Sequence, residues 1–446
     1  MTKQDTAPLR IAIAGLGTVG AAVIEVLQRD AERLAARCGR TIEIVGVTAR
    51  NRARKRAVDV SAYEWASDPA ALAKSDCDVF VELIGGDEGP AREAVEAALD
   101  AGRHVVTANK ALLAKHGVEL AERGERAGVA LAYEAAVAGG IPIIKTMRES
   151  FSGNEITRVS GILNGTCNYI LTRMEEEGIS FADCLAHAQR LGYAEADPTF
   201  DVRGDDTAHK LAILASLAFG TRISFEALHL EGITQLTLDD IEAAHDLGYR
   251  IKLLGVATRT RDGVETRVHP ALVPLETALA DVGGVLNAVI VESELLGEVM
   301  MVGPGAGGAA TASAVLGDIT DIARHSGPEG FRPVLGTRAS ELVPHEQAPT
   351  LSHPGGFFLR MEVLDRPGVM AAIAQAMAEQ SISLESIVQR SRSRDGARSG
   401  GPEDVQPIVL MTHETTQGAI AEAVRTMLAE DYLVAEPRVI RIERAS

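Results

Sequence analysis

The 446-residue chain contains few aromatic residues, with nine Phe, six Tyr and one Trp. Its hydrophobic cores must therefore be built mainly from Ala, Val, Leu and Ile. Cysteine is also scarce, and the four residues Cys38, Cys77, Cys167 and Cys184 include no C-x-x-C pair. This spacing excludes a disulfide-rich scaffold and argues against a metal site built from thiolates, so we expect reduced, partly buried thiols.

Long apolar runs and excess positive charge are absent as well. No apolar run approaches the roughly 20 residues that a membrane-spanning helix needs, and the polar segment Met1–Leu9 lacks the apolar region of a signal peptide. The formal net charge is −18, and an acidic surface repels the phosphate backbone of nucleic acids. We therefore expect a cytoplasmic protein that binds neither membrane nor nucleic acid.

The first part of the chain has the pattern of an α/β fold. At roughly 100–200 residues per domain, the chain has room for about two to four domains. Over residues 1–133, short β-rich runs alternate with helical stretches, which predicts a Rossmann-type parallel sheet with right-handed crossovers. The expected strands are Leu9–Ala14, Thr41–Val47, Asp78–Leu83, His104–Thr107 and Val129–Tyr133.

The pattern changes after residue 133. Residues 134–303 mix helical and β-rich segments, which predicts an α+β domain whose sheet covers one side of the first domain. The expected helices are Ile143–Phe151, Phe181–Leu191 and Asp205–Phe219, and the expected strands are Val159–Leu163, Lys252–Thr258 and Val289–Val291. Thr311–His325 is apolar at helical spacing, so we expect about 304–330 to complete the first domain.

The C-terminal part is predicted to be a separate small domain. Residues 331–355 show little periodicity and indicate a linker. Residues 356–446 then follow the β-α-β-β-α-β order of ferredoxin-like domains. Within this domain, the polar and glycine-rich stretch Ser391–Asp404 is expected to be a mobile loop.

A glycine-rich loop follows the first expected strand. Its residues Gly15, Leu16, Gly17, Thr18, Val19 and Gly20 match G-x-G-x-x-G between a strand and a helix. In that context the loop is typical of dinucleotide binding, because the helix N-terminus stabilises a pyrophosphate. The alternative interpretation is a glycine-rich turn without a ligand.

The end of the second expected strand bears on the choice between NAD and NADP. An acidic residue there would bind the ribose hydroxyls of NAD, but the chain continues as Thr48-Ala49-Arg50-Asn51. Arg50 has the planar fork that pairs with a 2′-phosphate. This favours NADP as the cofactor, with NAD accepted as well. The alternative is that Arg50 belongs to a solvated basic loop without a ligand.

Two polar segments are candidates for the chemistry. Lys110 follows the fourth expected strand, at the edge of the sheet where ligands gather. Gly192–Lys210 is the densest polar segment, and Asp206 and Lys210 share a face of a helix that Asp205 is expected to cap. Reduction of an aldehyde needs a proton donor, and binding of an amino group needs carboxylates. This segment supplies both kinds of side chain. The alternative for Asp206 and Lys210 is a surface ion pair.

The turn at Asn164-Gly165 also carries polar groups between a strand and a helix. They could line a substrate pocket, or the turn could simply cap the helix.

With these residues assembled, the chain resembles homoserine dehydrogenases of the long bacterial form that ends in an ACT domain. The resemblance covers nearly the whole chain. It is carried, in family order, by GLGTVG, TANK, GILNGTCNYI, GYAEADPTFDVRGDDTAHK and GPGAGGAAT. It implies NAD(P)H-dependent reduction of L-aspartate-4-semialdehyde to L-homoserine, and the reverse reaction, in threonine, methionine and isoleucine biosynthesis. The region 134–303 would then bind substrate and mediate dimerisation.

The resemblance also implies roles for single residues. Lys210 matches the catalytic lysine that donates a proton, and Lys110 matches a second lysine that contacts cofactor and substrate. Glu195 and Asp206 match carboxylates that bind homoserine, with Asp201 nearby. Residues Thr107 and Gly307 match positions beside the cofactor. The family further binds a monovalent cation, usually Na⁺, mainly through backbone carbonyls that match Glu134, Val137, Gly139 and Ile141.

The family is typically dimeric through the substrate region, so we expect a homodimer or homotetramer, and the family's usual effector is L-threonine. Leu364–Val369 resembles the ACT strand-to-helix turn, whose N–H groups can receive an amino acid. Two other functions are compatible with the same fold. A non-catalytic nucleotide or threonine sensor would show damage at Lys210, Lys110 or Glu195, and all three are intact. A dehydrogenase for another substrate would not need the stretch Gly192–Lys210.

Overall fold

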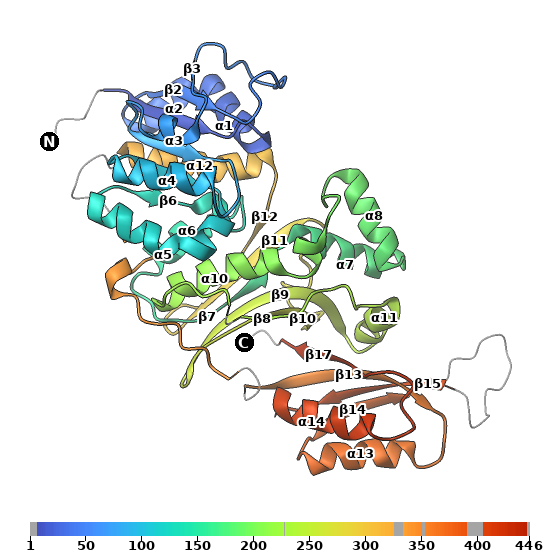
Figure 1. Cartoon of the computed structure of the whole chain (residues 1–446). Helices are drawn as coiled ribbons and strands as arrows, with labels where there is room; N and C mark the ends of the chain where they lie inside the picture. Colours follow the sequence, from blue (N-terminus) through green and yellow to red (C-terminus); the bar gives the residue numbers. More distant parts are fainter. Residues whose placement is uncertain (1–6, 227, 325–332, 350–352, 390–404, 444–446) are drawn as a thin grey trace.

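The computed structural model describes residues 7–226, 228–324, 333–349, 353–389 and 405–443. Two sheets organise these residues, one at the N-terminal end of the molecule and one that runs through its middle and C-terminal parts (Figure 1). Within the described ranges, no helix is both long enough and apolar enough to cross a membrane.

The first sheet is parallel, with the strand order β3-β2-β1-β4-β5-β6. This order confirms the Rossmann-type prediction, and the order reverses between β1 and β4, where ligands bind in such folds. Its strands are β1 (Leu9–Ala14), β2 (Ile42–Thr48), β3 (Glu64–Trp65), β4 (Val79–Glu82), β5 (His104–Thr107) and β6 (Leu131–Ala132). The short β3 was not predicted.

Helices cover both faces of this sheet because apolar side chains alternate along its strands. Ile11 and Ile13 pack with one set of helices, and Ala12 and Phe80 pack with the other. The first set is α1 (Thr18–Arg29), α2 (Ala31–Cys38) and α12 (Gly308–Arg324). The second set is α3 (Pro69–Ala73), α4 (Pro90–Asp100) and α5 (Lys110–Ala127). Helix α12 contacts α1 and α2, as expected for the described part of Thr311–His325.

The second sheet follows the path β12-β11-β7-β9-β10-β17-β13-β15-β14, with β8 beside β10 and β16 beside β13. Its middle strands are β7 (Ile156–Ile162), β8 (His229–Leu230), β9 (Tyr249–Thr260), β10 (Gly263–Pro274), β11 (Leu286–Ser293) and β12 (Gly297–Pro304). Strands β10 and β12 were not predicted. In β10, the charged Glu265 and Arg267 hide the apolar pattern, yet both are buried because they pair with each other at 2.7 Å.

The middle helices place the candidate site residues. They are η1 (Glu134–Ala136), α6 (Ile143–Lys145), η2 (Thr146–Ser150), α7 (Gly165–Glu177), α8 (Phe181–Leu191), α9 (Thr199–Val202), α10 (Asp205–Phe219) and α11 (Leu238–Asp246). Helix α10 packs on α5 and also on β7, β9 and β10, so it lies between the two sheets. The expectation that the second sheet itself covers the first domain is therefore corrected: a buried helix separates them.

The C-terminal elements confirm the ferredoxin-like order. They are η3 (Ala339–Glu341), β13 (Pro354–Leu364), α13 (Val369–Glu379), β14 (Leu384–Gln389), β15 (Val405–Thr412), β16 (Thr415–Thr416), α14 (Gln417–Leu428) and β17 (Arg438–Ile442). Strand β13 begins inside the expected linker. The loop Ser391–Asp404 lies outside the described residues.

The C-terminal sheet is buried on both faces. Phe357 and Leu359 pack under α13 and α14, whereas Phe358 and Val409 belong to the core of the middle region. Strand β17 also pairs in parallel with β10, which joins the two regions into one sheet. The predicted separate domain is therefore hydrogen-bonded to the rest of the chain along a strand edge.

An ionic cluster lies at this seam. Glu443, directly after β17, accepts hydrogen bonds from Arg267 at 2.6 Å and from Arg158 at 2.8 Å. His269 lies 3.5 Å from the same carboxylate. Burial on its own would raise the pKa of Glu443, but Arg267 and its neighbours hold the pKa well below the usual range.

We expect Glu443→Gln to lower the free energy of unfolding by about 3–5 kcal/mol at neutral pH, because it leaves buried guanidinium groups without their anion. Thermal and urea unfolding would measure the change. The control is Glu422→Gln on the exposed face of α14, which should stay within about 0.5 kcal/mol. Equal stability of the two variants would mean that the seam does not depend on this charge.

Candidate active site

The glycine loop after β1 is a compact turn. Gly15 has φ +105°, and a side chain on it would meet the carbonyl oxygen of Leu83 at 2.2 Å. A side chain on Gly20 would meet the carbonyl oxygen of Gly15 at 2.0 Å, whereas one on Gly17 would meet nothing within 4 Å. Helix α1 then begins at Thr18 without a side-chain cap. The loop thus has an open approach at Gly17 beside a helix N-terminus, which fits a pyrophosphate.

Segments distant in sequence meet this loop. Gly307, with φ +111°, precedes α12, and a side chain on Gly308 would lie 2.9 Å from the methyl group of Thr18. The structure therefore places the GPGAGG segment against the start of α1. Thr107 is fully buried, and its hydroxyl donates to Glu82 at 2.5 Å, so its side chain faces away from solvent.

Glu82 is a residue that the sequence analysis missed. It ends β4 and is fully buried, and it accepts hydrogen bonds from the backbone of Ile84 at 2.7 Å and of Gly85 at 3.0 Å as well as from Thr107. One carboxylate thus connects the ends of β4 and β5. The glycine loop follows β1, which lies beside β4, and Lys110 follows β5. A lone glutamate inside an apolar strand was the available signal.

A basic loop follows β2. Arg56 donates to the carbonyl oxygens of Asn51 at 2.6 Å and Arg54 at 2.7 Å, and its guanidinium lies over the ring of Trp65. These contacts organise the loop internally, and Arg50 at its start is exposed to solvent.

Two lysines converge on one buried aspartate. Lys210 Nζ lies 2.7 Å from Asp206 Oδ2 and donates to the carbonyl oxygen of Leu163 at 2.6 Å. Lys110 Nζ lies 3.0 Å from Asp206 Oδ1. Lys210 and Asp206 are 8 % and 5 % exposed, so their pairing is not the surface ion pair of the alternative interpretation. Gly204, not Asp205 as expected, occupies the N-cap of α10.

The surroundings move the pKa values of the two lysines in opposite directions. Burial lowers the pKa of Lys210, although Asp206 opposes this shift. The charge of Asp206 raises the pKa of Lys110. Burial alone would raise the pKa of Asp206, but Lys210 and Lys110 lower it. Oppositely shifted neighbours of this kind mark acid–base sites. Burial therefore favours the neutral amine at Lys210, whereas the charge of Asp206 favours the ammonium form at Lys110.

Asn164 orders the carboxylates around the lysines. Its side-chain amide donates to Asp201 Oδ1 and to Asp206 Oδ2, both at 2.8 Å. Its side-chain oxygen Oδ1 accepts from the backbone N–H of Cys167 at 2.8 Å and so caps α7. The helix-cap interpretation of the Asn-Gly turn is confirmed, and the capping residue also contacts Asp201 and Asp206.

The remaining carboxylates differ in their surroundings. Asp201 lies at the edge of the cluster, where burial raises its pKa and Asn164 opposes the shift. Glu195 lies on an exposed segment and acts on Lys110 through its charge. Of the expected substrate residues, Asp206 contacts both lysines and Asp201 contacts Asn164, whereas Glu195 is exposed.

The expected cation segment, residues 134–141, packs tightly against the glycine-rich segment that precedes α12. Ala138 has φ +53° and Gly139 has φ +43°, and a side chain on Gly139 would meet the carbonyl oxygen of Gly305 at 2.4 Å. The Glu134 carboxylate accepts from the backbone of Ile144 at 2.9 Å, and the Glu134 N–H donates to Asp318 at 2.9 Å. Burial raises the pKa of Asp318 to about 7.

The expected carbonyl positions Val137 and Ile141 lie in the same buried stretch. In the described part of the chain, no group of three or more His, Cys, Asp or Glu side chains could hold a metal ion. A cation in this segment would depend on backbone oxygens, which suit hard cations.

A Rossmann sheet with an open glycine loop, facing a buried lysine–aspartate–lysine cluster, defines a nicotinamide-dependent oxidoreductase. Residues 15–134 match the family model for the NAD-binding domain of homoserine dehydrogenase, residues 142–320 match that for homoserine dehydrogenase, and residues 357–427 match the ACT domain.

The chain is 44% identical to the homoserine dehydrogenase of Pseudomonas aeruginosa, over 98% of this chain and 99% of that one. A crystal structure of a homoserine dehydrogenase from Thiobacillus denitrificans is 41% identical, with a TM-score of 0.92 over 99% of this chain and 100% of that one. A hyperthermophilic archaeal homoserine dehydrogenase in complex with NADPH is 27% identical, with a TM-score of 0.61 over 70% of this chain and 97% of that one. The chain belongs to the homoserine dehydrogenase family.

We expect Asn164→Ala to lower kcat/KM by about tenfold to a hundredfold, because small displacements of catalytic groups have effects of that order. Steady-state rates with homoserine would measure it. Loss of the helix cap alone should cost about 1 kcal/mol of stability.

The matched control is Ser180→Ala, which removes the cap of α8 in a part of the chain outside the site. If both variants retain the same activity, the carboxylates do not need Asn164.

Proposed function

We propose that Lys210 is the proton donor when this chain reduces L-aspartate-4-semialdehyde to L-homoserine. The observation that carries the proposal is the burial of Lys210 against Leu163 and Asp206, with a lowered pKa. A general acid works best when its pKa approaches the working pH. Lys110, whose pKa is raised, lies on the other side of Asp206 and keeps a positive charge.

A nicotinamide cofactor held by the loop Gly15–Gly20 would supply the hydride to the aldehyde carbon. Lys210 Nζ then gives one proton to the oxygen, which becomes the hydroxyl group of homoserine. In the reverse direction the neutral amine of Lys210 takes that proton. The charge of Lys110 stabilises the developing alkoxide.

The carboxylates have separate roles in this proposal. Both oxygens of Asp206 already contact lysine or Asn164, so Asp206 chiefly holds the two lysines in place while it borders the substrate. Asp201 and the exposed Glu195 are then left to bind the ammonium group of the substrate.

The decisive variant is Lys210→Ala, followed as homoserine-dependent reduction of NADP⁺ and NAD⁺ at 340 nm. We expect kcat/KM to fall by about 10²–10⁴-fold, the usual contribution of a general acid or base. In the parent enzyme, aldehyde reduction should slow as pH rises through the pKa of Lys210, and homoserine oxidation should speed up.

The control is Lys252→Met on β9. It removes another buried lysine, which donates to the carbonyl oxygen of Val282 at 2.7 Å. It should lower stability and keep most of the activity. A folded Lys210→Ala enzyme with full activity would move the proton transfer to Lys110 or to water. A folded parent chain that oxidises homoserine with neither cofactor would favour the sensor alternative.

For the cofactor we propose NADP as the preferred form, with NAD also accepted. The loop residues Gly15, Leu16, Gly17, Thr18, Val19 and Gly20 would hold the pyrophosphate, with Gly307 beside them and Thr107 and Lys110 at the neighbouring strand end. The exposed Arg50 would pair with the 2′-phosphate. The archaeal relative was solved with NADPH, which supports this choice.

Arg50→Ala should raise the KM for NADP⁺ about tenfold or more and leave that for NAD⁺ nearly unchanged, since a hydrogen bond to a charged group contributes on the order of 1.5–3 kcal/mol. Arg54→Ala, in the same loop, is the control. Equal effects on both cofactors would assign Arg50 to the pyrophosphate or to loop folding.

Three further proposals follow the family resemblance. A Na⁺ ion would bind to the backbone oxygens of Glu134, Val137, Gly139 and Ile141, which the positive φ angles of this segment hold in an unusual turn. The chain would assemble as a homodimer or homotetramer. L-threonine would inhibit the enzyme through the ACT domain, whose family model matches residues 357–427.

A further inference from the structure

Lys110 occupies an unfavourable place for a cation. It is the first residue of the 18-residue helix α5, and the first turn of this helix contains no acidic side chain. The N-terminus of a helix carries partial positive charge, which repels an ammonium group, and the lysine stem is flexible. Yet Lys110 Nζ lies 3.0 Å from Asp206, on a helix of the middle region. Contacts outside the first turn of α5 therefore decide where this ammonium group lies.

A series of hydrogen bonds connects Glu82 to the start of α5. Glu82 Oε2 accepts from the Thr107 hydroxyl at 2.5 Å, and Thr107 Oγ1 accepts from the backbone N–H of Asn109 at 3.0 Å. Asn109 is the N-cap of α5, and its Oδ1 accepts from the N–H of Leu112 at 3.1 Å. Glu82 and Thr107 are fully buried, and Asn109 is 6 % exposed. These three residues, called the Glu82 relay below, end directly before Lys110.

The Glu82 relay also fixes the loop that follows β4. The Asn109 amide Nδ2 donates to the carbonyl oxygen of Gly86 at 2.6 Å. Glu82 Oε1 accepts from the N–H groups of Ile84 at 2.7 Å and Gly85 at 3.0 Å. A buried carboxylate is costly unless donors satisfy it, and both oxygens of Glu82 are used in these contacts. The ends of β4 and β5 and the start of α5 therefore form one hydrogen-bonded unit.

We propose that Glu82 is a positioning residue for Lys110. Through Thr107 and Asn109 it fixes the start of α5 and so holds the Lys110 ammonium group at Asp206. The inference rests on the proposed function, in which the charge of Lys110 stabilises the alkoxide, and it adds the buried anion that sets the place of this charge.

A displaced Lys110 would also change the second lysine. Burial lowers the pKa of Lys210, Asp206 and Asp201 oppose this shift, and the charge of Lys110 lowers the pKa further. Movement of Lys110 away from Asp206 therefore raises the pKa of Lys210. Homoserine oxidation, which uses the neutral amine of Lys210, then needs a higher pH. Loss of stability alone would not produce this change.

The test is the rate at which acetic anhydride labels Lys110, followed by mass spectrometry with the exposed Lys74 as internal reference. Only a neutral amine reacts, the charge of Asp206 raises the pKa of Lys110, and the Lys110 side chain is 32 % exposed to the reagent. Glu82→Gln keeps one oxygen, which cannot serve both the loop and Thr107. Thr107→Val removes the hydroxyl group without a change of shape.

We expect Lys110 to react about threefold to tenfold faster in Glu82→Gln and in Thr107→Val than in the parent chain, as weakening of a hydrogen bond between charged groups predicts. The double variant should react no faster than the faster single variant, because both substitutions break the same connection. In homoserine oxidation, Thr107→Val should lower kcat about tenfold to a hundredfold and move the pH profile to higher pH.

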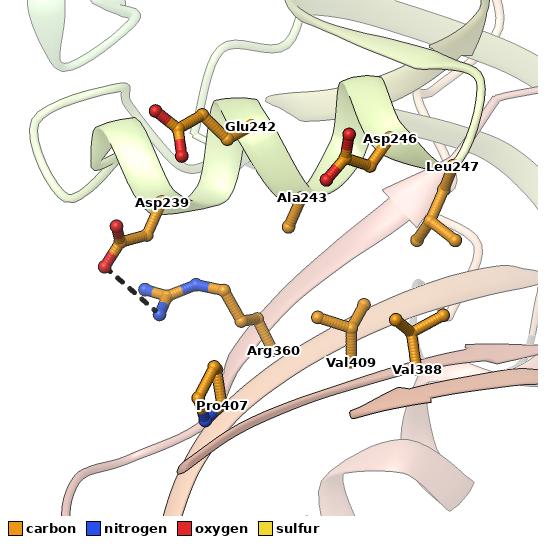
Figure 2. A pocket seen from close by; sticks show the side chains of 9 residues that line it. All are labelled: Asp239, Glu242, Ala243, Asp246, Leu247, Arg360, Val388, Pro407 and Val409. Carbon is orange, nitrogen blue, oxygen red and sulfur yellow. Dashed lines mark ion pairs between the residues drawn. The ribbon is translucent and has the colours of Figure 1, made fainter. Parts of the chain in front are cut away.

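The matched control is Asp240→Asn, which changes another fully buried carboxylate to an amide, in the capping box of α11. Asp240 accepts from Arg360 at 2.5 Å. Figure 2 shows this arginine beside α11, with a dashed line for its ion pair to Asp239. Asp240→Asn should lower the urea midpoint and leave the labelling of Lys110 and the pH profile as in the parent chain.

The inference is overturned if Lys110 is labelled at the parent rate in both relay variants, if their effects multiply in the double variant, or if Asp240→Asn speeds labelling equally. Should Glu82→Gln unfold, Thr107→Val decides alone. The labelling needs neither substrate nor cofactor. It therefore decides the positioning of Lys110 even if the parent chain fails to oxidise homoserine, which is the outcome that contradicts the proposed function.

Discussion

The contact of Asp206 with both Lys110 and Lys210 is the interaction on which the site depends. Lys110 begins α5 of the Rossmann region, whereas Asp206 and Lys210 lie on α10 of the middle region. One carboxylate therefore joins the part of the chain that would hold the cofactor to the part that would hold the substrate. In the proposed mechanism the hydride would come from one side of this boundary and the proton from the other, and Asp206 contacts a lysine on each side.

Such a buried cluster is costly for folding, because charges lose their hydration when they leave water. The chain offsets this cost locally. Asn164 and the carbonyl oxygen of Leu163 supply hydrogen bonds, and both stand at the end of β7. The same strand carries Arg158, which reaches Glu443 at the seam with the C-terminal sheet. The two buried ionic clusters thus share one strand, which gives the C-terminal region a physical connection to Lys210.

Much of the architecture was predictable because local patterns agreed with the final packing. The alternation of short apolar runs with helical stretches specified the Rossmann sheet, and the β-α-β-β-α-β order specified the C-terminal fold. Predictions failed where burial depended on distant partners. Strand β10 was not predicted because Glu265 and Arg267 have the charge of surface residues, and only the structure shows that they form a buried ion pair. The N-cap of α10 is Gly204 and not Asp205, because the backbone at this position has the left-handed conformation that favours glycine.

The sequence by itself determined the family, the glycine loop and the pairing of Asp206 with Lys210, since spacing along one strand, loop or helix carries each of these. Only the tertiary structure decided that Lys110 shares the same aspartate, that Asn164 and Glu82 serve the site, and that the C-terminal sheet continues the middle one. These features join residues far apart in the chain. The pKa shifts of Lys110 and Lys210 arise from burial and charge that exist only after the regions pack together.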